Sequence, residues 1–99
     1  MELDPDANVV RRLKDGDEAA FDLIYDAYRP RLFAFLFRLS RRRDVAEDLL
    51  AETWLRLVTR VGSLRDDTRL APWLFAVARN LFLSYRRWRL LDEDRVGEL

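Results

Sequence analysis

The sequence predicts an all-α protein, a compact bundle of about four helices in a single domain. Apolar residues recur at steps of three and four over long segments, which is the period of an amphipathic helix. Glycine and proline, the strongest interrupters of helices, occur only three times each in 99 residues. We find no strand-like alternation, internal repeat or low-complexity tract. A chain of this length supports one modest core.

Composition argues against several classes of protein. The chain has no cysteine and no histidine, so it lacks disulfides, thiolate chemistry and the commonest metal ligand and general base. We therefore expect no enzyme, cofactor or metal. The acidic start, MELDPDANVV, has no apolar signal segment, and the longest apolar run, residues 32–37, is too short to cross a bilayer. We expect a cytoplasmic protein without membrane insertion.

Charge is balanced over the chain but segregated along it. Lysine and arginine together number 18, as do aspartate and glutamate. Residues 29–43 hold six arginines and no acid, whereas residues 44–52 hold four acids and no base. This pattern predicts two oppositely charged surfaces.

The first helix is predicted over about residues 5–15. Asp4 followed by Pro5 is typical of a helix start, with the proline at the first helical position. Gly16 can end this helix in the left-handed conformation. Asp17 then serves as the cap of a second helix.

The second helix contains a proline without losing its pattern. Its apolar positions keep helical spacing on both sides of Pro30; they are Phe21, Ile24, Tyr25, Tyr28, Leu32, Phe35, Leu36 and Leu39. Proline removes a hydrogen bond and clashes with the preceding turn. We therefore expect one helix that bends at Pro30.

The third helix is predicted over about residues 45–60. Asp44 and Glu47 resemble a capping box at its start. One side is apolar and carries Leu49, Leu50, Thr53, Trp54, Leu57, Val58 and Val61. The other side carries Glu47, Asp48, Ala51, Glu52 and Leu55. On that side two carboxylates flank a solvent-facing leucine, although an ordinary solvated face gives the same pattern.

The last part of the chain is predicted to be a loop, a helix and a tail. Residues 62–69 (GSLRDDTR) lack apolar periodicity and concentrate turn formers. Pro72 fits the opening turn of a fourth helix that reaches about Leu91. The polar residues 92–99 are expected to fray.

The fourth helix carries three stripes. The first is apolar and is predicted to be core, with Leu74, Ala78, Leu81, Tyr85 and Trp88. The second mixes a ring, an amide, a hydroxyl and a cation, in Trp73, Asn80, Ser84 and Arg87. The third carries Phe75 and Phe82 with Arg79, Arg86 and Arg89. Outward rings, amides and arginines suit single-stranded nucleic acid, whereas arginines that cover aromatic faces also stabilise ordinary helices.

Three blocks together resemble region 2 of the bacterial extracytoplasmic-function sigma factors, small sigma subunits of RNA polymerase in the sigma-70 family. The blocks are GDEAAFDLIYDAYRPRLFAFLFRL, DVAEDLLAETWLRL and LAPWLFAVARNLFLSYRR, in the family's order and spacing. The resemblance extends from about residue 9 to residue 90. It implies an all-helical transcription initiation domain that docks on the polymerase β′ clamp helices and captures the melted −10 promoter element as the non-template single strand.

The resemblance also implies site residues. The polymerase-binding face would comprise Glu47, Asp48, Ala51, Glu52 and Leu55. The loop that receives a flipped base would comprise Leu64, Arg65, Asp66, Asp67 and Thr68. The recognition helix would add Trp73, Asn80, Ser84, Arg86 and Arg87, so that rings meet bases and guanidiniums meet phosphates. An anti-sigma factor is a further implied partner.

The sequence departs from the family pattern in two places. Ala51 stands where the family usually has glutamine, and the loop is bulkier and more acidic than the usual glycine- and serine-containing loop. The family's second helical domain, region 4, which reads the −35 element, has no counterpart in these 99 residues.

Two alternatives from other classes remain open. A helical interaction module could keep the polymerase or anti-sigma contact and lack DNA binding. A helical oligomer could use the aromatic stripe as a self-interface. An enzyme is the least favoured class, because acids without histidine, cysteine or a phosphate-binding loop offer no assembled site.

Overall fold

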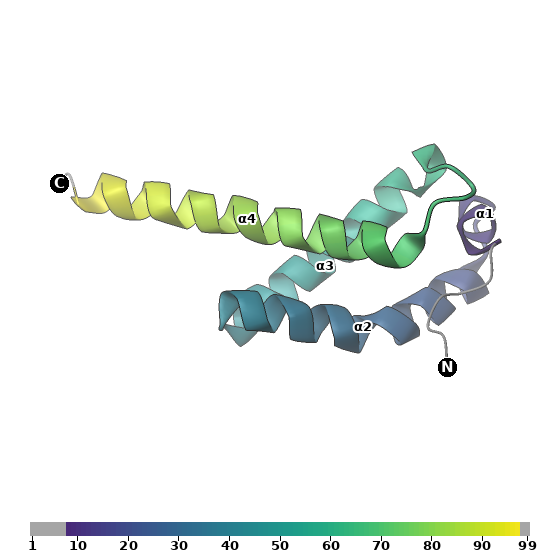
Figure 1. Ribbon diagram of the computed structural model, residues 1–99, viewed down its shortest axis with the longest axis horizontal. Helices are drawn as coiled ribbons and strands as arrows, with labels where there is room; N and C mark the ends of the chain where they lie inside the picture. The colour runs from purple at the N-terminus through teal and green to yellow at the C-terminus, as the bar shows by residue number, and fades with distance from the viewer. Residues whose placement is uncertain (1–7, 98–99) are drawn as a thin grey trace.

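The computed structural model describes residues 8–97, with side chains up to Asp92, and this part of the chain contains helices and no strand. The helices are α1 (Val9–Lys14), α2 (Glu18–Ser40), α3 (Arg43–Arg60) and α4 (Leu70–Gly97), with a 3-10 turn, η1 (Val61–Ser63), after α3. In Figure 1, α1 lies across one end of the bundle, and α4 projects beyond the other. The predicted four-helix all-α fold is confirmed. No helix of the described residues is long and apolar enough to span a bilayer.

The junction between α1 and α2 has the predicted chemistry. Gly16 has a φ of +78° and donates its N–H to the carbonyl of Leu13, which ends α1 in the left-handed conformation. The Asp17 carboxylate accepts the N–H groups of Ala19 and Ala20 at the start of α2. Helix α1 begins at Val9, later than predicted. The expected start, Asp4 and Pro5, lies outside the described residues.

Helix α2 is continuous through Pro30, and its axis changes direction near its middle in Figure 1, as predicted. Proline weakens the helix locally, but the apolar row holds both halves on the core. The fully buried members of that row are Ala20, Ile24, Tyr28, Leu32 and Leu36. Leu39, at the end of the pattern, is exposed because it lies in the last turn of α2.

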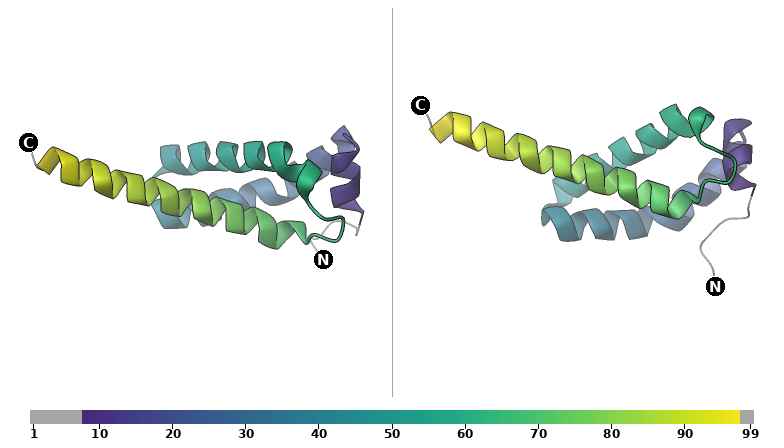
Figure 2. Two further views of the ribbon diagram at one scale, coloured as in Figure 1. Left: turned by 90° about the horizontal axis from the view of Figure 1, so that it is seen from above. Right: turned by 45° about the horizontal axis from the view of Figure 1, so that its top comes forward.

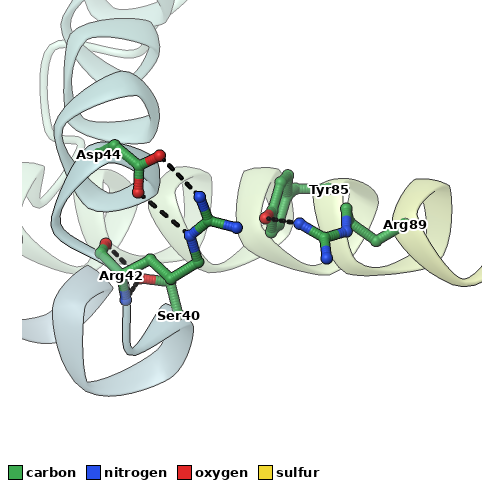
Figure 3. Close-up of polar contacts among 5 residues, drawn as sticks. All are labelled: Ser40, Arg42, Asp44, Tyr85 and Arg89. Atoms are coloured by element: carbon green, nitrogen blue, oxygen red, sulfur yellow. Dashed lines mark hydrogen bonds and ion pairs between the residues drawn. The ribbon is translucent and has the colours of Figure 1, made fainter.

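The turn between α2 and α3 is tighter than predicted. Arg41 adopts the left-handed conformation (φ +60°) and donates its N–H to the carbonyl of Phe37. The extended residue Arg42 then leads directly into α3, so Asp44 lies inside the first turn and is not the cap. Its carboxylate instead accepts two hydrogen bonds from Arg42, at 2.9 and 3.2 Å, as Figure 3 shows. The predicted capping box is therefore wrong.

The core lies where α2, α3 and α4 meet. From α3 it takes Thr53, Trp54 and Leu57, and the Thr53 hydroxyl is satisfied by the carbonyl of Leu49 at 2.8 Å. Val58, predicted on the buried side, is 57% exposed. It lies at the edge of α3, where it lines a small apolar pocket of about 190 Å³.

Helix α4 is buried only along its first half. Leu70, Leu74 and Ala78 are buried, whereas Trp88, predicted to be core, is 72% exposed. The reason is length: 28 residues of helix extend about 42 Å, and the end of α4 passes beyond the other helices (Figures 1 and 2). The helix also continues to Gly97 instead of ending near Leu91, because no proline or glycine occurs between these two residues.

We predict that truncation of two apolar residues of α4 has unequal effects on stability. Leu74→Ala should lower the free energy of unfolding by about 2–5 kcal/mol, because it opens a cavity in the core. Trp88→Ala should change it by less than about 0.5 kcal/mol, because the ring is exposed. Urea unfolding followed by circular dichroism measures both. Equal losses would show that the end of α4 is packed in solution.

We also predict that the cap of α2 makes stability depend on pH. The pKa of Asp17 lies below its ordinary value, chiefly because Arg12 donates a hydrogen bond to the carboxylate and also because the N–H of Ala20 does. This contribution is present above the ordinary carboxylate pKa, about 3.9, and is lost as pH falls through the lowered value. Urea midpoints of wild type and Asp17→Asn should therefore differ at pH 6, and the difference should shrink as pH falls below the ordinary carboxylate pKa. A constant difference would contradict the assignment.

Candidate functional site

The loop between η1 and α4 is short and fastened at both ends. Leu64, its first residue, is half-buried and packs against the core, and Leu70 beyond it is buried at the start of α4. Between them, the N–H of Thr68 donates to the carbonyl of Arg65 at 3.0 Å and closes a turn. The side chains of Arg65, Asp66 and Asp67 are exposed at this turn. Of the five predicted loop residues, three are exposed at the turn, whereas Leu64 and Thr68 are half-buried.

The acids of this loop are each paired with a cation. Arg65 binds Asp67 through two hydrogen bonds of 3.1 and 3.0 Å. Lys14, from α1, lies 2.9 Å from Asp66. The hydrogen bond and the charge of Lys14, with the charge of Arg11, hold the pKa of Asp66 below its ordinary value. The loop is acidic in sequence, but its carboxylates do not face solvent as isolated charges.

The second stripe of α4 begins at the loop and extends away from it. Trp73 is half-buried and packs against the core, so only part of its ring remains accessible. Asn80, Ser84 and Arg87 are exposed, as predicted for this stripe. Arg86, beside them, is exposed too. The stripe thus offers a partly covered ring, followed by an amide, a hydroxyl and guanidinium groups.

The aromatic rings of the third stripe serve mainly the fold. Phe75 and Phe82 are half-buried and pack against the core. Phe75 meets Phe35 of α2 edge to face, with ring centroids 5.2 Å apart, and the Arg31 guanidinium lies 5.6 Å from its centroid. Phe75 therefore fits the interpretation in which an arginine covers the face of a packed aromatic ring and stabilises an ordinary helix.

The predicted polymerase-binding residues lie on one side of α3. Glu47, Asp48, Ala51 and Leu55 are exposed, and Glu52 is half-exposed. The Leu55 side chain is 54% exposed, an apolar group in an acidic surface. Two of these acids are paired along the helix.

These pairs join arginine and glutamate four residues apart. Arg43 Nε lies 3.6 Å from Glu47 Oε2, and Arg56 Nε lies 3.3 Å from Glu52 Oε2. Exposed pairs of this kind add little to the stability of the fold. The acidic surface of α3 is therefore partly compensated by its own helix.

A groove of about 970 Å³ between α2 and α3 was missed by sequence reasoning. Two of the predicted residues, Glu47 and Ala51, line it. The remaining lining residues are Tyr25, Asp26, Arg29, Pro30, Phe33, Arg43, Leu50 and Trp54. The available signal is a row of residues four apart on α2, at positions 25, 29 and 33, that alternates rings with a cation.

Cations lie over the rings of this groove. The Arg29 guanidinium is 5.7 Å from the Tyr25 ring centroid, and that of Arg43 is 5.8 Å from the Phe33 centroid. Both cations are exposed. The acidic surface of α3 therefore borders a groove with aromatic walls, and the charged lining residues of this groove include both cations and acids.

Known proteins resemble this chain in sequence. Residues 24–89 match the model of the family Sigma-70 region 2. The chain is 37% identical over 82 residues to the "ECF RNA polymerase sigma factor SigM" of Bacillus subtilis (strain 168), an alignment that covers 79% of this chain and 50% of the relative. It is 44% identical over 69 residues to the "ECF RNA polymerase sigma factor EcfG" of Rhodopseudomonas palustris (strain TIE-1), with 69% and 38% covered. The chain thus spans about half the length of these relatives or less.

A solved structure has the same fold. It is the NMR structure of an engineered region 2 of sigmaE in complex with GTAAAA, with a TM-score of 0.74 and 25% sequence identity. The match covers 100% of this chain and 99% of that chain. The helical fold, the family match and these similarities together show that the chain belongs to the sigma-70 family, as a region 2 domain of the extracytoplasmic-function type.

Proposed function

We propose that the chain acts in transcription initiation by docking on the β′ clamp helices of RNA polymerase and holding the −10 element as an unpaired non-template strand. The docking surface is the acidic side of α3. The DNA surface is the loop over residues 64–68 with the second stripe of α4. A cytoplasmic location and an anti-sigma factor as a further partner follow from this role.

The observation that carries the DNA assignment is the exposed row at positions 80, 84 and 87. Asn80, Ser84 and Arg87 follow one another at helical spacing, beginning about two turns after the half-buried Trp73. An amide can read the edge of an unpaired base, a hydroxyl accepts or donates a hydrogen bond, and a guanidinium binds phosphate. We therefore assign this row of α4 to the DNA surface.

The similar solved region 2 supports the same assignment. That protein is in complex with GTAAAA, and its chain aligns with the full length of this one. Single-stranded nucleic acid is bound by aromatic platforms with nearby cations. The loop and α4 of this chain offer such groups together.

The docking assignment rests on α3. Its exposed acids surround Leu55, so a partner with basic residues around an apolar contact would fit this surface. The groove beside it adds Arg29 and Arg43 over aromatic rings. A partner helix laid along α3 would meet both features.

We predict that Glu52→Arg weakens binding to a β′ clamp-helix fragment by about 1–3 kcal/mol, the range of a substantial interface residue. The fold should survive, because Glu52 is half-exposed and its pair with Arg56 is a surface one. Titration by isothermal calorimetry measures the loss. Asp92→Arg, an equal charge reversal at an exposed position of α4, is the control and should bind normally. Equal affinity of Glu52→Arg and wild type would remove this side of α3 from the proposal.

We predict that Asn80→Ala reduces the preference for one strand sequence over another without lowering the melting temperature. The preferred single strand is first selected from a random pool that includes GTAAAA, and its affinity is compared with that of a permuted strand and of the duplex by fluorescence anisotropy. In the same assay, Trp73→Ala should weaken binding of the preferred strand by about 1–3 kcal/mol per stacked base. Because the ring is half-buried, a thermal melt of this variant is measured in parallel to separate lost binding from lost stability.

Arg87→Ala serves as the sequence-independent reference in that experiment. It should weaken both strands equally and reduce the salt slope by about 0.7 for each phosphate that the variant no longer binds. If wild type binds preferred, permuted and duplex DNA equally weakly, the interaction module without DNA binding becomes the better interpretation. Polymerase docking would then remain to explain α3.

A further inference from the structure

An ion pair joins the loop before α4 to α1, across a long stretch of sequence. Lys14 Nζ lies 2.9 Å from Asp66 Oδ1, and the two residues are 52 positions apart. The Lys14 side chain is 26% exposed, whereas that of Asp66 is 62% exposed. Lys14 is therefore the more enclosed partner, and Asp66 is the one that faces solvent.

This contact fastens the middle of the loop. Its first residue, Leu64, packs against the core, and Leu70 is buried at the start of α4. Inside the loop, the Arg65 side chain binds Asp67 and the Arg65 carbonyl accepts the N–H of Thr68. These internal bonds give the turn its shape but do not attach it to another helix. The Lys14–Asp66 pair supplies an attachment at the tip.

The same contact also compensates the negative charge of Asp66. A carboxylate repels DNA phosphates unless a cation lies beside it. Asp67 has its cation inside the loop, in Arg65, whereas Asp66 obtains its cation from another helix. The hydrogen bond and the charge of Lys14, with the charge of Arg11, hold the pKa of Asp66 below its ordinary value. Without Lys14, Asp66 would lose its hydrogen-bonded cation at the place where the strand is expected.

We propose that Lys14 is a positioning residue of the DNA interface, which neutralises Asp66 and holds the loop tip against α1 in the conformation that receives a base. The inference rests on the proposed function of the loop. Lys14 lies about 50 residues before the loop and outside every residue set assigned to DNA from sequence. Loss of the pair should alter strand discrimination, because the loop tip is no longer held against α1. The melting temperature should stay unchanged, because a surface ion pair adds little to the stability of a fold.

The test compares the affinity ratio of the preferred strand to the permuted strand in a set of variants. Lys14→Gln should lower this ratio by roughly threefold to tenfold, which is at most about 1.4 kcal/mol. Lys14→Arg keeps the charge and should retain most of the ratio. The exchange of both residues, Lys14→Asp with Asp66→Lys, restores a pair of the same net charge and should recover discrimination that each single change loses.

Arg38→Gln is the matched control. It removes one positive charge, as Lys14→Gln does, from an exposed position near the end of α2. In Figure 1 that end lies away from α1 and the loop. A general loss of positive charge weakens both strands alike. Arg38→Gln should therefore leave the ratio at its wild-type value.

A second readout observes the ion pair without DNA. Lys14 is the only lysine of the chain, so reductive methylation with ¹³C-formaldehyde gives one lysine NMR signal, distinct from that of the α-amino group. Asp66→Asn should shift this signal, and Asp92→Asn should not. An unchanged signal in Asp66→Asn would show that the pair does not form in solution and would overturn the inference.

The outcomes of these experiments distinguish the role of Lys14 from the proposed DNA-binding function on which it rests. If wild type discriminates between strands and Lys14→Gln discriminates equally well, only the role of Lys14 is overturned. If the double exchange fails to restore the ratio although it keeps the net charge, the Lys14–Asp66 pair does not set discrimination and the positioning role is rejected. If wild type shows no discrimination at all, the proposed DNA function fails and the inference fails with it.

Discussion

The structure depends on one row of buried side chains along α2. Ala20, Ile24, Tyr28, Leu32 and Leu36 follow one another at four-residue steps, and each is fully buried. α1, α3 and α4 all pack against α2, so a shift of this row by one position would turn the contact surface for every other helix. Proline at position 30 is tolerated because the row continues on both sides of it. The tertiary contacts outweigh the lost hydrogen bond.

This arrangement separates the surfaces that remain. The buried sides of α3 and α4 are committed to α2 and to each other, which leaves the acidic side of α3 and the polar stripe of α4 outside. A substitution on either outward surface removes little from the core. Residues on such surfaces can change in charge and size with little loss of stability, so they can be selected for the partner that they bind.

Sequence reasoning succeeded where the signal was local and periodic. Helix type, the Gly16 turn, the Asp17 cap and the continuous helix through Pro30 all follow from spacing and from the conformational preferences of single residues. It failed where the result depends on how far neighbouring helices extend. Trp88 continues an apolar stripe, yet it is exposed because α2 and α3 do not reach it.

Competition between side chains and contacts between distant parts of the chain explain the other failures. Asp44 has the right spacing for a cap, but its carboxylate binds the Arg42 side chain and α3 begins two residues earlier than predicted. The Lys14–Asp66 pair joins residues 52 positions apart, so no window of sequence contains it. The groove between α2 and α3 likewise requires the crossing of two helices. Helical spacing predicted which side chains of α4 face outward, such as Asn80 and Ser84, whereas the pairing of charges in the candidate site required the fold.

The compensated acids of α3 change what an interface on this helix would be. Glu47 and Glu52 each hold an arginine of the same helix, so an incoming basic group competes with a resident one. Association is then an exchange of ion pairs. The binding free energy gained is only the difference between the pair with the partner's basic group and the resident pair with arginine. Such a contact discriminates through geometry more than through strength. It also remains readily reversible, because each departing cation has a replacement one helical turn away.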